Sequence, residues 1–300
     1  MKINCLSDLA EAAKAKSEKT AVVVVEAHDE QTIKSVISAV YEGIIYPILI
    51  GDVNRISELL KNAGANPQDY EMVSSSGSRD SLKNATSLIR SGKAKAMMKG
   101  SLDTAELLKA VLDERNGLLS GGILSLAAMF DTPNYHKIFA ISDMVVNVFP
   151  DFMRKRVIVE NAVGMLNKLG IPQPKVAVLA AIEKLNPKMP ETVDADALKL
   201  MNQNAKITNC IVEGPISFDL ATSAEAAKIK GYVSPVAGDA DLLIVPDIVS
   251  GNLLAKCLTG MGGAKTAGVV LGAKVPIILT SRSAPASDKY YSIALAACVG

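Results

Sequence analysis

Runs of apolar residues alternate with segments of helical periodicity along the whole chain. Several runs are apolar at every position rather than at every second one, which is typical of parallel strands covered on both faces. Helical patterns lie between the runs, for example at Glu30–Glu42, Thr104–Glu114, Arg154–Leu169 and Ser250–Leu258. The strands that this pattern predicts are Ala21–Glu26, Pro47–Gly51, Ala94–Met98, Lys137–Ser142, Lys175–Ile182, Asn209–Glu213, Asp241–Pro246 and Pro276–Thr280.

This order of strands and helices predicts right-handed crossovers and a layered α/β fold. Pro and polar residues interrupt the pattern at Phe130–His136, and Gly272–Pro276 is a second point where the chain can cross between domains. We therefore expect two α/β domains with a cleft between them, one of residues 1–136 plus 277–300 and one of residues 137–276. Ligands in such folds bind beyond the carboxyl ends of strands or in a cleft, so candidate chemistry is expected there.

Composition narrows the class of protein. The 300 residues include 32 Lys and Arg against 31 Asp and Glu, a balance that provides no field for holding a nucleic acid. The first residues predict an amphipathic helix rather than a signal peptide, and the apolar runs are too short to cross a bilayer. Cys5, Cys210, Cys257 and Cys298 stand far apart and are expected to be free thiols. We therefore expect a cytoplasmic protein with no nucleic acid or membrane as partner.

The most informative segment is the corner that follows the strand ending at Thr280. Ser281 and Arg282 come next, and a helix is expected to begin near Pro285 with Asp288 in its first turn. Arg282 can present a fork of donors to a phosphate or an oxyanion, Ser281 can donate a hydrogen bond, and Asp288 can accept a proton. The alternative, that Asp288 only complements the helix dipole, stays open at this point.

Three further strand ends carry polar residues that could contact a substrate. Lys99 and Gly100 precede a helix whose free N–H groups favour anions, while Asp103 with Glu106 fits a capping box that needs no ligand. The remaining candidates are Asp143 and Asn147 after one strand, and Asn252 and Lys256 on a helix that follows another; the alternative is that they satisfy loops and helix starts.

Several familiar signals are missing. Neither a phosphate-binding loop nor a complete dinucleotide fingerprint occurs, and the chain has only two histidines, His28 and His136. We therefore expect no metal site and interpret both histidines as ordinary surface or loop residues.

Six segments, in this order and spacing, resemble phosphate acetyltransferases and butyryltransferases over essentially the whole chain, the butyryl branch most closely. They are MKGSLDTAELLKAVL (Met98–Leu112), the Asp143, Asn147 and Pro150 pattern, NPKMPETVDA (Asn186–Ala195), EGPISFDLA (Glu213–Ala221), PDIVSGNLLAK (Pro246–Lys256) and LTSRSAPASDK (Leu279–Lys289).

The resemblance implies the reaction acyl-CoA + phosphate ⇌ acyl phosphate + CoA, with no cofactor beyond the substrate coenzyme A. It also implies a fold like that of the isocitrate and isopropylmalate dehydrogenases, in a homodimer or larger homo-oligomer. The family's catalytic Ser-Arg pair and Asp match Ser281, Arg282 and Asp288. The acetyl branch has a further phosphate-binding Arg before the position of Asp143, and this chain lacks that Arg. The candidates to replace it are Lys99, Lys137 and Arg154.

Other functions stay open at this stage. Within the same chemistry, the enzyme could prefer acetyl, propionyl or branched acyl groups over butyryl. A metal- and NAD-dependent dehydrogenase of the same fold is the main rival from another class, and the scarcity of histidine argues against it. A non-catalytic binding protein is a further rival.

Overall fold

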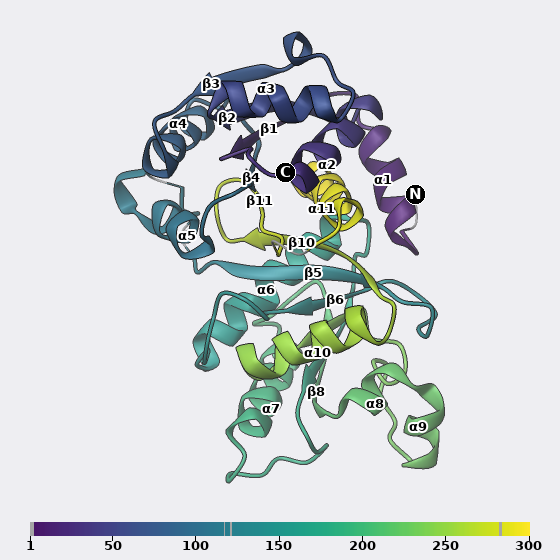
Figure 1. Ribbon diagram of the computed structural model, residues 1–300. Coiled ribbons are helices and arrows are strands. Elements are labelled where there is room, and N and C mark those ends of the chain that lie inside the picture. Colours follow the sequence, from purple (N-terminus) through teal and green to yellow (C-terminus); the bar gives the residue numbers. More distant parts are fainter. Residues whose placement is uncertain (1–2, 117, 121, 282–283) are drawn as a thin grey trace. The chain divides into compact units, whose positions relative to one another are not determined.

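The computed structural model describes residues 3–116, 118–120, 122–281 and 284–300 (Figure 1). The chain forms two compact units, each of which takes up separate stretches of sequence. Unit 1 consists of Met1–Leu6 and Ile123–Thr266, and unit 2 consists of Ser7–Gly122 and Ala267–Gly300. Among the described residues, no helix has both the length and the apolar character needed to cross a membrane.

Unit 2 contains a twisted sheet with the strand order β3-β2-β1-β4-β11-β10. All neighbouring strands are parallel except β10, which runs antiparallel to β11. The strands are β1 (Thr20–Val25), β2 (Ile45–Gly51), β3 (Glu71–Ser74), β4 (Ala96–Lys99), β10 (Lys265–Leu271, from Ala267 onward in this unit) and β11 (Ile277–Ile278). The helices are α1 (Leu6–Lys14), α2 (Glu30–Tyr41), α3 (Val53–Asn62), α4 (Ser78–Arg90), α5 (Thr104–Leu112) and α11 (Ala286–Val299), with short 3₁₀ turns at Pro67–Asp69 and Glu114–Asn116.

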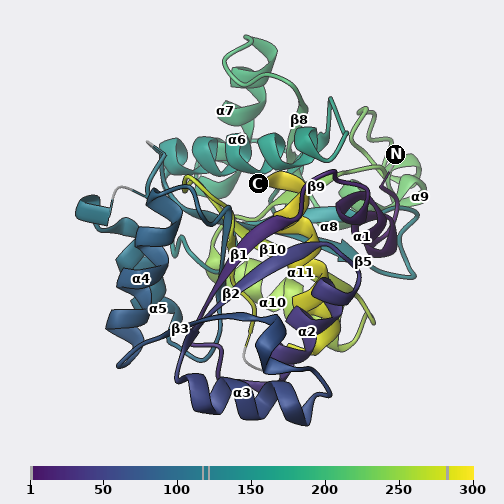
Figure 2. The same ribbon diagram turned by 90° about the horizontal axis from the view of Figure 1, so that it is seen from above.

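The centre of unit 2 lies around β1, whose TAVVVV sequence is apolar on both faces. Val22–Val25 are fully buried, as expected for a parallel strand covered by helices on each side. Figure 2 shows α11 beside α2, and the Tyr290 hydroxyl of α11 donates to Glu42 at the end of α2 over 2.6 Å. The C-terminal helix is therefore an integral part of this unit.

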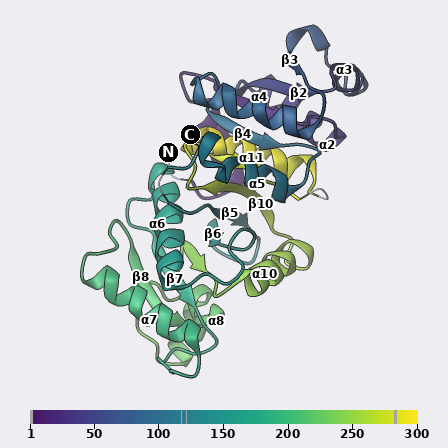
Figure 3. The same cartoon turned by 90° about the vertical axis from the view of Figure 1, so that its left-hand side faces the viewer.

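Unit 1 contains a sheet with the strand order β5-β6-β9-β7-β8. β5 and β6 are antiparallel, and the other neighbours are parallel. Figure 3 shows α6 and α7 on one side of β6 and β7, and α10 on the other. The strands are β5 (Ser125–Asp131), β6 (Phe139–Ser142), β7 (Lys175–Leu179), β8 (Ile211–Ile216) and β9 (Leu242–Ile244); the helices are α6 (Phe152–Lys168), α7 (Pro190–Gln203), α8 (Phe218–Thr222), α9 (Ala224–Ile229) and α10 (Ile248–Gly260).

The chain passes from one unit to the other at residues that differ from those expected from the sequence. The change occurs after Gly122 and Thr266, whereas the sequence suggested residues 136 and 276. The reason is local: Phe130 pairs with Phe139, so the segment between them, which contains Pro133, joins the antiparallel strands β5 and β6. Its polar residues belong to a connection within unit 1, which has the same turn chemistry as a linker.

Aspartate side chains cap several helices. Asp29, Asp52 and Asp151 each accept a backbone hydrogen bond from the first turn of the next helix, as N-caps do. The capping box expected at Asp103 and Glu106 does not form. Asp103 holds the cap position without a side-chain capping bond, and Glu106 instead accepts from Ser78 Oγ over 2.5 Å.

Candidate active site

Two of the three expected catalytic residues, Ser281 and Asp288, lie at the carboxyl edge of the sheet in unit 2. β1, β4 and β11 are parallel neighbours, so their carboxyl ends lie side by side. β4 ends at Lys99, and β11 leads through Thr280 into Ser281, which is exposed. α11 follows, with the half-buried Asp288 in its first turn. Arg282 lies outside the described residues.

Gly100 is fixed by the close approach of two strand ends. Its N–H donates to the carbonyl of Val25 over 2.8 Å, and a Cβ built on it would lie 2.1 Å from the carbonyl oxygen of Glu26. Only glycine fits at this point. Its neighbour Lys99 is 4% exposed, and its ammonium donates to the carbonyls of Gly100 at 3.2 Å and Leu102 at 3.0 Å. A positive charge is therefore held at this edge of the sheet.

A second buried lysine stands at the same corner, and sequence reasoning missed it. Lys289 is 3% exposed, and its ammonium donates to Thr280 Oγ1 at 3.0 Å and more weakly to the carbonyl of Ser281 at 3.5 Å. Burial lowers the pKa of Lys289, an effect that the charge of Asp29 opposes. The only signal in the sequence was its place directly after Asp288.

The candidates in unit 1 gather around the segment after β6. The buried carboxylate of Asp143 accepts from the backbone N–H groups of Val145, Val146 and Asn147 at 3.0–3.1 Å, and from Asn147 Nδ2 at 2.6 Å. Asn147 Nδ2 also donates to the carbonyl of Leu124 over 2.8 Å. Asp143 and Asn147 therefore shape this loop, whatever else they contact.

The same loop lies against α10. Asn252 Nδ2 is 3.5 Å from the carbonyl of Met144, and a Cβ on Gly251 would lie 3.0 Å from Met144 Cβ. Lys256 comes one turn after Asn252 on α10 and is exposed. The structure thus brings Asp143, Asn147 and Asn252 together in unit 1, and Lys99, Gly100, Ser281 and Asp288 together in unit 2.

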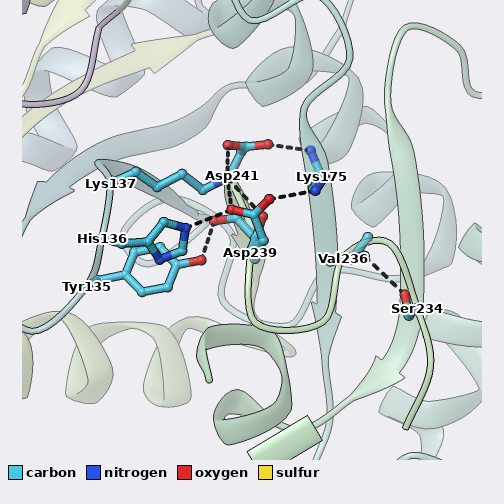
Figure 4. Close-up of polar contacts among 9 residues, drawn as sticks. Tyr135, His136, Lys137, Lys175, Ser234, Val236, Asp239 and Asp241 are labelled. Atoms are coloured by element: carbon cyan, nitrogen blue, oxygen red, sulfur yellow. Dashed lines mark hydrogen bonds and ion pairs between the residues drawn. The ribbon is translucent and has the colours of Figure 1, made fainter. Parts of the chain in front are cut away.

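Lys137 is held at the opposite, amino-terminal edge of the strands in unit 1 (Figure 4). Its ammonium forms ion pairs with Asp239 at 2.8 Å and Asp241 at 2.6 Å, and Lys175 also contacts Asp239. Burial opposes ionisation of Asp239, but hydrogen bonds from Lys137, Lys175 and His136 bring its pKa well below the usual range. Lys137 therefore neutralises carboxylates instead of facing an anionic substrate.

Arg154 is the third candidate cation, and it lies in the first turn of α6, where its side chain is exposed. Of the three, Lys99 is the buried cation at a carboxyl edge. That position is where ligands of parallel sheets bind.

His28 lies in a loop, as expected from the sequence, and its ring takes part in a hydrogen-bond network. It follows β1, and its Nε2 accepts from the N–H of Asp52 over 2.7 Å, so Nδ1 carries the proton that faces Glu26 Oε2 at 3.1 Å. Glu26 in turn accepts from the Ser81 hydroxyl. This partly exposed network joins the ends of β1 and β2 to α4 and borders a cavity of about 410 Å³.

A second cavity of about 750 Å³ lies between α4 and α5, the helices that follow β3 and β4. Four basic side chains line it against two carboxylates, which makes it the more positive of the two cavities. Its charged lining consists of Arg79, Lys83, Lys109 and Arg115, with Glu106 and Asp113.

Comparison with known proteins identifies the family. A family model described as "Phosphate acetyl/butaryl transferase" matches residues 5–81 and 58–297. The chain belongs to this family. It is 38% identical to the phosphate butyryltransferase of Clostridium acetobutylicum over 94% of each chain, and 40% identical to the phosphate acetyltransferase of Thermotoga maritima over 97% of this chain and 98% of the relative.

Solved structures agree with this assignment. A branched-chain phosphotransacylase from Enterococcus faecalis has a TM-score of 0.81 at 35% identity, and the match covers 93% of this chain and 99% of that one. A 4-hydroxythreonine-4-phosphate dehydrogenase from Salmonella typhimurium has a TM-score of 0.60 over 94% of this chain; at 13% identity this likeness shows the fold alone.

Membership of the phosphate acetyl/butyryl transferase family makes the protein an acyltransferase that acts on coenzyme A and phosphate. The family, the fold class and the enzyme class inferred from the sequence are confirmed, and all four cysteines are free thiols. The described residues contain no group of three or more His, Cys, Asp and Glu side chains that could hold a metal. The roles of the individual site residues stay predictions.

Proposed function

We propose that this protein is a phosphate butyryltransferase that catalyses butyryl-CoA + phosphate ⇌ butyryl phosphate + CoA in the cytoplasm, without a cofactor beyond the substrate coenzyme A. Similarity to the Clostridium enzyme over nearly the full length supports the butyryl group. The nearly equal similarity to a phosphate acetyltransferase makes acetyl the second candidate. Similarity to a branched-chain phosphotransacylase of known structure supports an acyl-binding pocket that is larger than an acetyl group requires.

The observation that carries this proposal is the corner at the carboxyl ends of β4 and β11. Buried ammonium groups of Lys99 and Lys289 provide positive charge next to the exposed Ser281 and the carboxylate of Asp288. Phosphate and acyl phosphate are the anions that such a corner attracts, and a carboxylate is the group that can take a proton from a thiol. Arg282 follows Ser281 in the sequence and would complete the set of donors.

In the direction of acyl-CoA synthesis, Asp288 takes the proton of the CoA thiol while the sulfur of that thiol attacks the carbonyl carbon of butyryl phosphate. The C–S bond forms, Ser281 and Arg282 stabilise the oxyanion, and the C–O bond to phosphate breaks. A reference Asp and a reference thiol differ by about 4.6 pKa units, or roughly 6 kcal/mol against complete proton transfer. Either desolvation raises the pKa of the carboxyl group, or the proton moves together with the attack.

The positive cavity between α4 and α5 supports a place for the phosphates of coenzyme A. Both helices begin at the carboxyl edge that carries the proposed chemistry, and their starts are joined by the bond from Ser78 to Glu106. Basic side chains such as Arg79 and Lys109 can pair with phosphate oxygens. We therefore place the phosphate-bearing end of coenzyme A at this cavity.

An exposed apolar stripe on α10 supports assembly into a homodimer or larger homo-oligomer. Val249 and Leu253 of α10 and Met261, directly after its end, follow one another at intervals of four or eight residues and are 54%, 65% and 88% exposed. The free Cys257 lies between them and is also exposed. In a two-fold symmetric dimer the stripe of one protomer packs against the same stripe of its partner, so both stripes are removed from water.

The test measures the release of CoA from acetyl-, propionyl-, butyryl- and isobutyryl-CoA in the presence of phosphate, for the wild type and for Asp288→Asn. We expect the highest kcat/KM with butyryl-CoA, and a fall in turnover by about 10²–10⁴-fold in the variant with little change in acyl-CoA affinity. Asp8→Asn, in the first turn of α1, is the matched control for an acid near a helix start. A clear preference for acetyl-CoA would overturn the butyryl assignment, and normal turnover of Asp288→Asn would move the base elsewhere.

A further inference from the structure

Three lysines are buried among the described residues: Lys99, Lys155 and Lys289. The ammonium of Lys155 pairs with the carboxylate of Asp194 at 2.7 Å, as is usual for a buried charge. Lys289 differs from Lys155, because in the described part of the chain no carboxylate oxygen lies within 4.0 Å of its Nζ. Its two hydrogen-bond acceptors there are the neutral oxygens of Thr280 and Ser281.

A buried ammonium with neutral partners leaves a positive charge that the protein itself compensates poorly. Asp29, the N-cap of α2, acts on Lys289 only through space. An ammonium has three donors, of which Thr280 Oγ1 takes one at 3.0 Å and the carbonyl of Ser281 takes a second, longer bond. The charge is therefore suited to attract an anion at the end of β11.

The hydrogen bonds of Lys289 also fix the corner itself. They join the first turn of α11, which carries Asp288, to Thr280 and Ser281, which follow β11. The peptide between them contains no regular structure in its described part, so this side chain is a direct tie between the two ends. Without these hydrogen bonds, the distance between Asp288 and Ser281 would be set by the connecting loop alone.

We propose that Lys289 is a positioning residue of the acyl-transfer site, which ties Ser281 to Asp288 and provides the buried positive charge that the phosphate group of the substrate compensates. This role rests on the proposed function. This role predicts two separate kinetic effects. The charge of Lys289 contributes to phosphate affinity, and its hydrogen bonds to Thr280 and Ser281 contribute to turnover.

The experiment compares the wild type with Lys289→Met, which keeps the length of the side chain and removes its charge, and with Lys155→Met as a matched buried lysine outside the site. Phosphorolysis of butyryl-CoA is followed at varied concentrations of each substrate. In Lys289→Met we expect the KM for phosphate to rise about 10- to 100-fold, the effect of losing a charged hydrogen-bonding group. The KM for butyryl-CoA is expected to stay within about 2-fold, and Lys155→Met is expected to match the wild type in both constants.

Thr280→Val separates the tie from the charge and serves if Lys289→Met does not fold. It removes the hydroxyl acceptor and keeps the ammonium, so we expect turnover to fall by about 10-fold with the KM for phosphate close to wild type. An inactive wild type overturns the proposed function. An active wild type with an unchanged KM for phosphate in Lys289→Met, or with unchanged turnover in Thr280→Val, overturns the role of Lys289 alone.

Discussion

Asp143→Asn tests whether the residues after β6 build the loop or contact the substrate. Each carboxylate oxygen of Asp143 accepts two hydrogen bonds, Oδ1 from Val145 and Val146 and Oδ2 from the backbone and side chain of Asn147. An asparagine keeps one oxygen and replaces the other with an NH₂ group, which faces two donors. Two bonds to a charged acceptor are lost, each of about 1.5–3 kcal/mol, and relaxation of the loop recovers part of this.

We therefore expect Asp143→Asn to lower the free energy of unfolding by about 3 kcal/mol, a large part of the 5–15 kcal/mol typical of a domain. The assay is urea unfolding followed by circular dichroism, with the midpoint and the slope compared with wild type. Asp151→Asn is the matched control, because its carboxylate accepts one backbone bond at the start of α6 and its loss should cost only about 0.5–1 kcal/mol. Under native conditions both variants should keep near-normal KM values.

The opposite pattern would refute this reasoning. If Asp143→Asn unfolds at the wild-type midpoint but its KM for phosphate or acyl-CoA rises, the carboxylate contacts substrate directly. The four internal bonds would then be secondary to binding.

Two further predictions concern residues whose roles the sequence suggested. Arg282→Lys keeps the charge but loses the planar fork of donors, so turnover in the CoA-release assay should fall by about 10²–10³-fold; near-normal turnover would reduce Arg282 to a general electrostatic contact. Leu253→Glu places a charge in the apolar stripe of α10, and we expect light scattering to show dissociation to monomers, with Leu112→Glu, another exposed leucine, as the control that keeps the wild-type mass. A Leu253→Glu variant of unchanged mass would place the interface elsewhere.

Much of the fold followed from apolar patterns, and the exceptions have physical reasons. The eight strands predicted from the sequence each overlap an observed strand, because most are rich in β-branched residues and buried on both faces. β5 was missed because its SLAAMFD sequence lacks β-branched residues and suits a helix equally well. β10 begins with Lys, Thr, Ala and Gly, and β3 is only four residues long, so neither gives a clear signal.

The positions of Ser281 after a strand and of Asp288 in the first turn of the next helix were predictable, while their roles stay predictions. The candidate site was not predictable where burial decides. Lys289 and the His28–Glu26 network have no motif. Their surroundings include groups distant in sequence, Asp29 at the start of α2 for Lys289 and Ser81 of α4 for Glu26. The reverse holds for Gly100, which resembles part of an anion-binding turn but is required by the carbonyl of Glu26, and for Asp143, whose carboxylate is occupied by its own loop.

The division of unit 2 into two stretches of sequence affects how the protein can fold. β4 pairs with β11 across about 180 residues, since Met98 lies beside Ile278. During synthesis the first 122 residues emerge long before their partner strand and α11, while unit 1 has all but its first six residues in one continuous stretch. Closing so long a loop is slow. Unit 1 should therefore reach its native state first on the ribosome, and the edge of β4 stays open to wrong partners until the last 34 residues have left the exit tunnel.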